Sequence, residues 1–262
     1  MCELLGLCLA QPASASISIQ DFAHRGDENA DGWGLAWYPD RSLAIVKEPV
    51  KWRASPYTGF LEGYSNLMSA IYLAHVRHRT TGGEPTRADS HPFARELAGR
   101  EYCFAHNGTI LGPFWELPLG RFRPIGKTDS EHVFCHLLEG VTQLDDHLAD
   151  EAGWRWLHGQ LTALNRQGRI NCLLSDGERL FCYHDAAGWK GLHLSKIYIR
   201  ENKLSHFEDE TLRIELGHEA SVNHGFLIAS QPLSGKGWQP FQPGELLVVE
   251  AGLARYSSHR AV

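Results

Sequence analysis

The sequence predicts an α+β protein in which two β-sheets pack against each other and the helices form separate layers. Twelve short runs are apolar, or alternate between apolar and polar residues as strands do, whereas only four segments carry helical signals. The helical segments lie in the first two thirds of the chain and the strands run throughout, which favours segregated layers over an alternating parallel sheet. No repeat, low-complexity tract or Gly/Ser linker interrupts the chain, so we expect one domain over residues 1–262.

The predicted strands are too many for one sheet to bury, which is why two packed sheets are expected. They occupy Glu3–Ala10, Gly34–Tyr38, Leu43–Lys47, Ala70–Arg77, Tyr102–His106, Arg169–Leu174, Arg179–His184, Leu192–Ile199, Leu212–Leu216, Gly225–Ala229, Glu245–Glu250 and Leu253–Ser257.

The predicted helices are Ser16–His24, Ser55–Leu67, Thr128–Glu139 and Glu151–Arg166. The second opens with Ser-Pro, which is a helix start signal. The third has acidic residues in its first turn, where the helix dipole favours them. The fourth carries an apolar stripe and is closed by Gly168.

Composition narrows the functional classes. A hydrophobic content of 43% and a charged content of 21% are ordinary for a soluble globular protein, and no apolar stretch approaches the roughly 20 residues of a membrane span. The net charge of -6, with no basic cluster, argues against a nucleic-acid partner. Six cysteines without a Cys-x-x-Cys pair indicate reduced thiols, so we expect a cytoplasmic protein.

The 15 histidines raise the question of a metal site. His132 and His136 are spaced to share a helix face with Cys135 between them, and His75 and His78 flank a dipeptide. Neither pair comes with a His-Glu-x-x-His pattern or a third ligand, so we expect core or surface histidines and no metal or other cofactor.

Cys2 follows the initiator methionine directly. Removal of Met1 would leave a thiol and a free α-amine on one residue, and their ordinary pKa values of roughly 8.5 and 8 allow the amine to act as base for the thiol. The alternative is a buried strand cysteine, because Cys2 opens the apolar run that ends at Leu9.

Two polar segments lie in the first third of the chain. His24-Arg25-Gly26-Asp27, followed by Asp31-Gly32-Trp33-Gly34, implies tight turns or a close backbone approach, although a surface turn is equally consistent with it. In the second, Arg77 ends an apolar strand where it could hold a carboxylate with two hydrogen bonds, and Thr80 and Thr81 could add hydroxyl contacts. A solvated basic loop is the alternative.

Two further polar segments follow. Asn107-Gly108 is either a hairpin turn or an oxyanion hole made of the Asn107 amide and the Gly108 backbone N–H. Asp129 either serves the start of a helix or binds a substrate ammonium group. Taken with Cys2 and Arg77, these groups suit attack on the side-chain carbonyl of a free α-amino acid.

The chain resembles the class II glutamine amidotransferases of the N-terminal-nucleophile hydrolase superfamily, and within them a stand-alone, YafJ-like subgroup. The matching motifs occur in order: Met1-Cys2-Glu3-Leu4-Leu5-Gly6, His24-Arg25-Gly26, Asp31-Gly32-Trp33-Gly34, Ala74-His75-Val76-Arg77, Thr80-Thr81-Gly82, Ser90-His91-Pro92-Phe93, Ala105-His106-Asn107-Gly108 and Thr128-Asp129-Ser130-Glu131. The segments Ile228–Leu233 and Pro243–Leu246 are similar to the C-terminal part of that subgroup.

The resemblance implies a four-layer αββα sandwich and a glutamine amidotransferase type-2 domain that has lost Met1. It also implies hydrolysis of glutamine to glutamate and ammonia. By position, Cys2 is the nucleophile, and Asn107 and Gly108 form the oxyanion hole. Arg77 would bind the substrate carboxylate and Asp129 its ammonium group.

The same resemblance places Arg25 and Gly26 near the nucleophile and Thr80 beside the substrate. The arginine loop, Arg77-His78-Arg79-Thr80-Thr81-Gly82, departs from the Arg-Trp-Ala-Thr-His-Gly of members built onto synthases, so coupling to a synthase partner stays open. A hydrolase of larger γ-glutamyl amides and a catalytically silent regulatory subunit stay open as alternatives. The expected partner is a small-molecule substrate.

Overall fold

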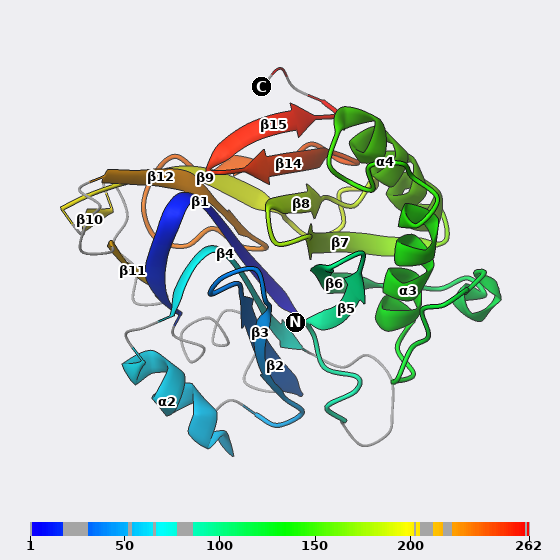
Figure 1. The fold of residues 1–262 in the computed structure, drawn as a ribbon, viewed down its shortest axis with the longest axis horizontal. Coiled ribbons are helices and arrows are strands. Elements are labelled where there is room, and N and C mark those ends of the chain that lie inside the picture. Colours follow the sequence, from blue (N-terminus) through cyan, green and yellow to red (C-terminus); the bar gives the residue numbers. More distant parts are fainter. Residues whose placement is uncertain are drawn as a thin grey trace.

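The computed structural model describes residues 2–17, 31–51, 54–64, 67–77, 86–201, 203–204, 212–216, 222–259 and 261. The strands form two sheets in which every described pair is antiparallel (Figure 1). We call the nine-stranded sheet the first sheet and the six-stranded sheet the second sheet.

The first sheet has the strand order β10-β9-β12-β1-β4-β2-β3, with β11 paired to β1 and β13 paired to β9. Its members are β1 (Glu3–Ile17), β2 (Gly32–Trp37), β3 (Ala44–Glu48), β4 (Met68–Arg77), β9 (His193–Arg200), β10 (Lys203–Leu204), β11 (Leu212–Leu216), β12 (Val222–Ala229) and β13 (Gln239–Pro240). The second sheet has the order β15-β14-β8-β7-β6-β5. Its members are β5 (Phe93–Leu97), β6 (Arg100–Ile110), β7 (Gly168–Ser175), β8 (Arg179–Tyr183), β14 (Leu246–Glu250) and β15 (Leu253–Ser257).

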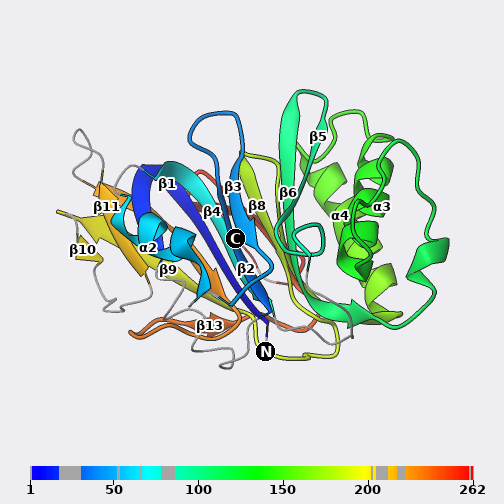
Figure 2. The same cartoon turned by 90° about the horizontal axis from the view of Figure 1, so that it is seen from below.

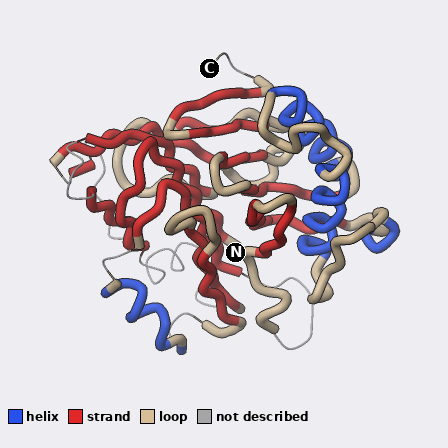
Figure 3. The backbone as a smooth tube through the Cα atoms, viewed as in Figure 1, coloured by secondary structure: helices blue, strands red, loops and turns tan. Residues whose placement is uncertain are grey.

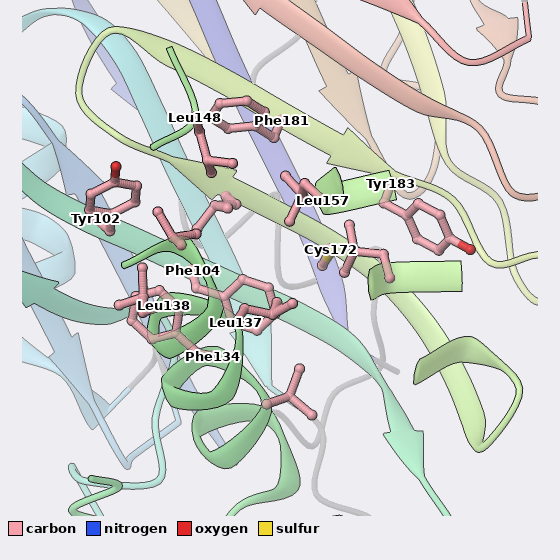
Figure 4. Close-up of a cluster of buried hydrophobic side chains, with 14 of the residues drawn as sticks. Tyr102, Phe104, Phe134, Leu137, Leu138, Leu148, Leu157, Cys172, Phe181 and Tyr183 are labelled. Atoms are coloured by element: carbon pink, nitrogen blue, oxygen red, sulfur yellow. The ribbon is translucent and has the colours of Figure 1, made fainter. Parts of the chain in front are cut away.

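Three apolar layers hold the fold together and confirm the predicted sandwich. The middle layer joins the facing sides of the two sheets through residues such as Leu4, Leu73 and Leu173. A second layer joins the second sheet to the helices α3 (Asp129–Val141) and α4 (Glu151–Asn165), and Figure 4 shows its aromatic centre. A third covers the outer side of the first sheet and includes Leu61 of helix α2 (Pro56–Gly63). Figure 2 shows the first sheet, the second sheet and the α3–α4 pair as successive layers, and Leu61 of α2 packs in the cluster on the outer side of the first sheet.

The helices begin where their capping residues lie. Thr128 caps α3 by accepting a hydrogen bond from the Glu131 N–H, and Asp150 caps α4 through the Gly153 N–H. Ser55 caps α2, which has Pro56 in its first turn. The 3-10 turn η2 (Phe114–Glu116) precedes α3. No described helix has both the length and the apolar character that a membrane span requires.

The structure differs from the sequence-based predictions at β1, α2 and β5, and Figure 3 shows the observed helices and strands. Strand β1 runs to Ile17, so the predicted helix from Ser16 is wrong at its first two residues, and the rest of it lies outside the described residues. Helix α2 ends at Gly63, before Leu67. Strand β5 was not predicted, because Phe93-Ala94-Arg95-Glu96-Leu97 offers only two apolar ends around a charged middle.

Candidate active site

Cys2 and Arg77 lie opposite each other at the end of the first sheet. Glu3 of β1 pairs with Val76 of β4, and the same antiparallel register continued by one residue brings Cys2 to Arg77. Leu4 and Leu73 face the second sheet. Because side chains alternate along a strand, Cys2 and Arg77 face the second sheet as well. The strand pairing therefore brings the predicted nucleophile and the predicted carboxylate-binding residue together.

Cys2 is also chemically distinct from the other five cysteines. It is half-buried, whereas Cys8, Cys103, Cys135, Cys172 and Cys182 are buried. Burial raises the pKa of Cys8 to about 12 and raises the pKa of Cys103 and Cys172 as well. Since the thiolate is the nucleophilic form, these buried thiols are inert at neutral pH.

Asn107 approaches Cys2 from the second sheet. Its Nδ2 donates to the backbone carbonyl of Cys2 at 2.8 Å, which leaves a second amide hydrogen on the same nitrogen. Asn107 and Gly108 lie inside β6, paired with Asn171 and Ile170 of β7. The hairpin-turn interpretation of this pair is therefore wrong, and the reason is the long-range pairing with β7.

The Gly108 N–H points away from β7. Strand β5 pairs with β6 only as far as Phe104, so the β5 side of β6 is open beyond that residue. The Ile110 N–H on this side donates to the Asp129 carboxylate at 2.7 Å. N–H groups two residues apart in a strand point the same way, so the Gly108 N–H emerges on this side too. A Cβ at Gly108 would clash with the Arg169 carbonyl oxygen, which explains why only glycine fits.

Asp129 is the first residue of α3, and the cap itself is Thr128. One oxygen of Asp129 binds the Ile110 N–H, and the other accepts from the Ser130 N–H at 2.8 Å. Asp129 therefore does lie at the start of a helix, as one of the two interpretations expected, and its hydrogen bond to the Ile110 N–H also links α3 to β6. It fixes a half-buried carboxylate at the open side of β6, beside the predicted oxyanion donors.

Two buried histidines lie behind Arg77. The rings of His75 and His91 are 4.3 Å apart, and none of their ring nitrogens has a hydrogen-bond partner among the described residues. The same is true of Nη1 of Arg77. Burial, followed by the charge of Arg77, lowers the pKa of His75 to about 3, and burial lowers the pKa of His91 as well. Both rings are therefore neutral at pH 7 and leave the arginine as the local cation.

The loop that carries His91 is held against the first sheet. Nζ of Lys47 donates to the carbonyls of Ser90 and Pro92 at 2.6 and 3.0 Å. A Cβ at Gly34 would clash with the His91 carbonyl, so this glycine of the Asp31–Gly34 motif permits a close backbone approach. His106 lies on the face of β6 opposite to Asn107, where its ring nitrogens form hydrogen bonds with the Ser130 hydroxyl and the Arg169 carbonyl.

Residues after β12 hold the start of β1. Oγ of Ser230 accepts from the Leu4 N–H at 2.6 Å, and the Ser230 N–H donates to the Leu4 carbonyl at 3.0 Å. Nε2 of Gln231 donates to the Glu3 carboxyl at 3.1 Å. Burial raises the pKa of Glu3 to about 7. These contacts fix the residues that follow Cys2.

Arg25, Gly26 and Thr80 lie outside the described residues, so their predicted roles stay predictions. Sequence reasoning assigned no role to His91, Asn171 or Ser230, although Ser90–Phe93 and Ile228–Leu233 were among the matching motifs. In the described part of the chain, no three His, Cys, Asp or Glu side chains converge as metal ligands do. His132 and His136 instead contact the carbonyls of Leu117 and Pro118.

Comparison with known proteins gives three results. The family model of the class II glutamine amidotransferases matches residues 1–261. The uncharacterized protein MJ1515 of Methanocaldococcus jannaschii is 39% identical over 261 residues, which cover 99% of this chain and 72% of MJ1515. YafJ of Escherichia coli K12, named provisionally as a glutamine amidotransferase, is 32% identical over 255 residues, which cover 94% of this chain and 96% of YafJ.

A similar solved structure is that of a predicted glutamine amidotransferase from Pseudomonas aeruginosa PA01. It is 26% identical and aligns with a TM-score of 0.73 over 97% of this chain and 99% of its own. The similarity therefore extends over both sheets and includes the C-terminal half that carries Ser230.

Proposed function

Because this chain belongs to the class II glutamine amidotransferases, we propose that it hydrolyses the side-chain amide of a γ-glutamyl substrate, with glutamine as the simplest one, through a thioester on Cys2. The products from glutamine are glutamate and ammonia. No cofactor enters the reaction.

The observation that carries the proposal is the contact between the two sheets at Cys2. The Asn107 amide touches the backbone of Cys2, and Arg77 faces the same space from the neighbouring strand. One half-buried thiol, one arginine and the Asn107–Gly108 pair therefore lie at the same end of the sandwich. This set matches what an acyl transfer from an amino-acid side chain requires.

The proposed reaction begins after Met1 is removed. The freed α-amine takes the thiol proton, and the Cys2 sulfur attacks the amide carbon. The carbonyl oxygen becomes an oxyanion held by the free Asn107 amide hydrogen and the Gly108 N–H. The C–N bond then breaks, the leaving nitrogen takes the proton from the α-ammonium group, and water hydrolyses the thioester through a second oxyanion.

Substrate binding divides between two charged residues. Arg77 pairs with the α-carboxylate, since its Nη1 has no hydrogen-bond partner among the described residues. Asp129 pairs with the α-ammonium group from the open side of β6. We infer that its existing hydrogen bonds to Ile110 and Ser130 keep the carboxylate in place.

The test uses protein whose Met1 removal has been verified by mass spectrometry. Cys2→Ala should lower glutaminase kcat by at least about 10³-fold, and Asn107→Ala by about 10²–10³-fold. Cys8→Ala is the matched control, because it removes a buried thiol six residues along the same strand, and it should stay active. Hydrolysis by Cys2→Ala would refute the mechanism. A processed wild-type protein that cleaves neither glutamine nor any γ-glutamyl amide would instead support the silent-subunit alternative.

A further inference from the structure

Arg169, Trp189 and Lys190 form a compact group that the proposed reaction on glutamine does not use. The guanidinium carbon of Arg169 lies 5.2 Å from the centroid of the Trp189 ring, and Nζ of Lys190 lies 4.6 Å from it. Two cations thus lie within cation–π distance of one indole. Arg169 is exposed, and Trp189 and Lys190 are half-buried. We call this group the cationic rim.

The cationic rim is tied to Cys2 through two asparagines. Nδ2 of Asn171 donates to the Trp189 carbonyl at 2.9 Å, and Asn171 pairs directly with Asn107, which contacts Cys2. Paired residues on neighbouring strands are only about 5 Å apart. The loop that carries Trp189 joins β8 to β9, and Lys190 of this loop interacts electrostatically with Glu3, the first residue of β1.

The cationic rim and Asp129 lie on opposite sides of β6. Asp129 binds the Ile110 N–H on the side of β6 that faces β5. Arg169 belongs to β7, on the other side, and pairs with Thr109. A substrate that placed its glutamyl part between Arg77 and Asp129 would direct the group beyond its amide nitrogen towards β7 and Trp189.

The loop is held in a strained conformation that its contacts maintain. Lys190 has a φ of 53°, a left-handed conformation that is uncommon for residues other than glycine. Asp185 accepts from the Ala187 and Trp189 N–H groups at 2.9 and 3.1 Å, and its other oxygen accepts from the Ile170 N–H. Backbone strain that the surroundings enforce is concentrated at binding sites. Here it sets the direction in which Lys190 leaves the loop.

We propose that the cationic rim is a leaving-group subsite for γ-glutamyl amino acids and short γ-glutamyl peptides, whose released amine carries a carboxylate. Arg169 and Lys190 would bind that carboxylate, and the Trp189 ring would pack against the carbon chain between it and the amide nitrogen. Ammonia has no group that reaches this subsite. The inference rests on the proposed function and adds a substrate class to it.

The reaction is a hydrolysis and needs no further reactant. The amide C–N bond breaks as the Cys2 thioester forms, and the amino acid or peptide leaves as a neutral amine after taking a proton from the α-ammonium group. Water then releases glutamate. One water is consumed for each γ-glutamyl bond cleaved.

The test compares two probes that differ by one charge, γ-glutamyl-alanine and γ-glutamyl-alaninamide. For the processed wild-type protein, kcat/KM should favour the carboxylate by about tenfold at low salt, and the preference should shrink as salt screens the charges. The pair Arg169→Gln and Lys190→Asn should abolish the preference, whereas Arg169→Lys should retain most of it. Asparagine is chosen at position 190 because it tolerates the left-handed backbone.

Lys196→Asn is the matched control, since it removes an exposed lysine of β9 in the first sheet, whose Nζ lies 5.8 Å from the Phe226 ring. It should leave the preference and the glutaminase rate unchanged. Glutamine hydrolysis without any preference between the two probes would overturn the subsite and leave the proposed function standing. Failure to hydrolyse glutamine and both probes would overturn the proposed function itself.

Discussion

Acidification from pH 7 to pH 5 should lower the free energy of unfolding by about 2 kcal/mol through His75 alone. The pKa of this histidine falls from 6.5 to about 3 on folding, chiefly because its ring is buried, with the charge of Arg77 as the next cause. The unfolded chain therefore binds a proton over a pH range in which the folded protein does not. Stability from this group is present above pH 6.5 and is lost as the pH falls towards 3.

The magnitude follows from the two pKa values. At pH 5 the unfolded histidine is almost fully protonated and the folded one is not, so the unfolded state gains about 1.4 kcal/mol for each pH unit below 6.5. That gives about 2 kcal/mol between pH 7 and pH 5. The side chain is 0% exposed, so solvent does not screen this difference.

The assay is urea unfolding of the wild type, His75→Gln and His75→Phe at both pH values. The absolute stability of each variant does not matter, because the prediction concerns the change with pH. Both variants should lose about 2 kcal/mol less than the wild type on acidification. Equal pH dependence in all three proteins would show that His75 is protonated or solvated in the folded state, and the account of a neutral histidine pair behind Arg77 would be wrong.

Three other perturbations test neighbouring parts of the site. Glu3→Gln should have the opposite effect to the histidine variants, because burial raises the Glu3 pKa from 4.5 to about 7. The contribution of Glu3 to the free energy of unfolding is therefore present at low pH, and about 2 kcal/mol of it is lost as the pH rises from 5 to 7. In urea unfolding, the variant should gain less stability than the wild type when the pH is lowered from 7 to 5. Gly108→Ala should shift β6 away from the Arg169 carbonyl and lower kcat by at least about tenfold, whereas Gly159→Ala, at a helical site with open space, should leave kcat unchanged. Thr128→Ala should cost about 1 kcal/mol in thermal unfolding, and an unchanged Tm would mean that the cap does not hold the start of α3.

The sequence specified most of the fold because the strand and helix signals are local. Leu212–Leu216 and Leu253–Ser257 were predicted to the residue, and α3 and α4 within two residues at each end. Prediction failed where pairing partners decide the structure. Strand β1 continues past Ala10 because its second half pairs with β11, which is about 200 residues away in the chain. Strand β5 forms because β6 offers a partner, while Glu96 stays exposed and the half-buried Arg95 pairs with Glu131 of α3.

In the candidate site too, local residue chemistry was readable from the sequence, whereas the pairing between distant strands was not. Residue chemistry was enough to select Cys2, Arg77, Asn107, Gly108 and Asp129. It could not show that Asn107 and Gly108 lie inside a strand, because an Asn-Gly pair after an apolar run is also the usual signal of a hairpin turn. It also could not place the Trp189 loop beside Asn107, since that contact depends on the pairing of β6 with β7.

The position of the nucleophile depends on the register of β1, and hydrophobicity alone cannot set that register. The strand is buried on both faces from Glu3 to Leu9, so a slip by one residue would still bury apolar side chains. Size sets the register at one position, because Gly6 faces Leu173 and Leu180 of the second sheet, whereas Leu5 and Leu7 on either side of it face outward. A Cβ on Gly6 would already lie 3.0 Å from Leu173, so a leucine there would not fit. Steric exclusion at Gly6, together with the Ser230 contacts to Leu4, is therefore what directs Cys2 towards Asn107.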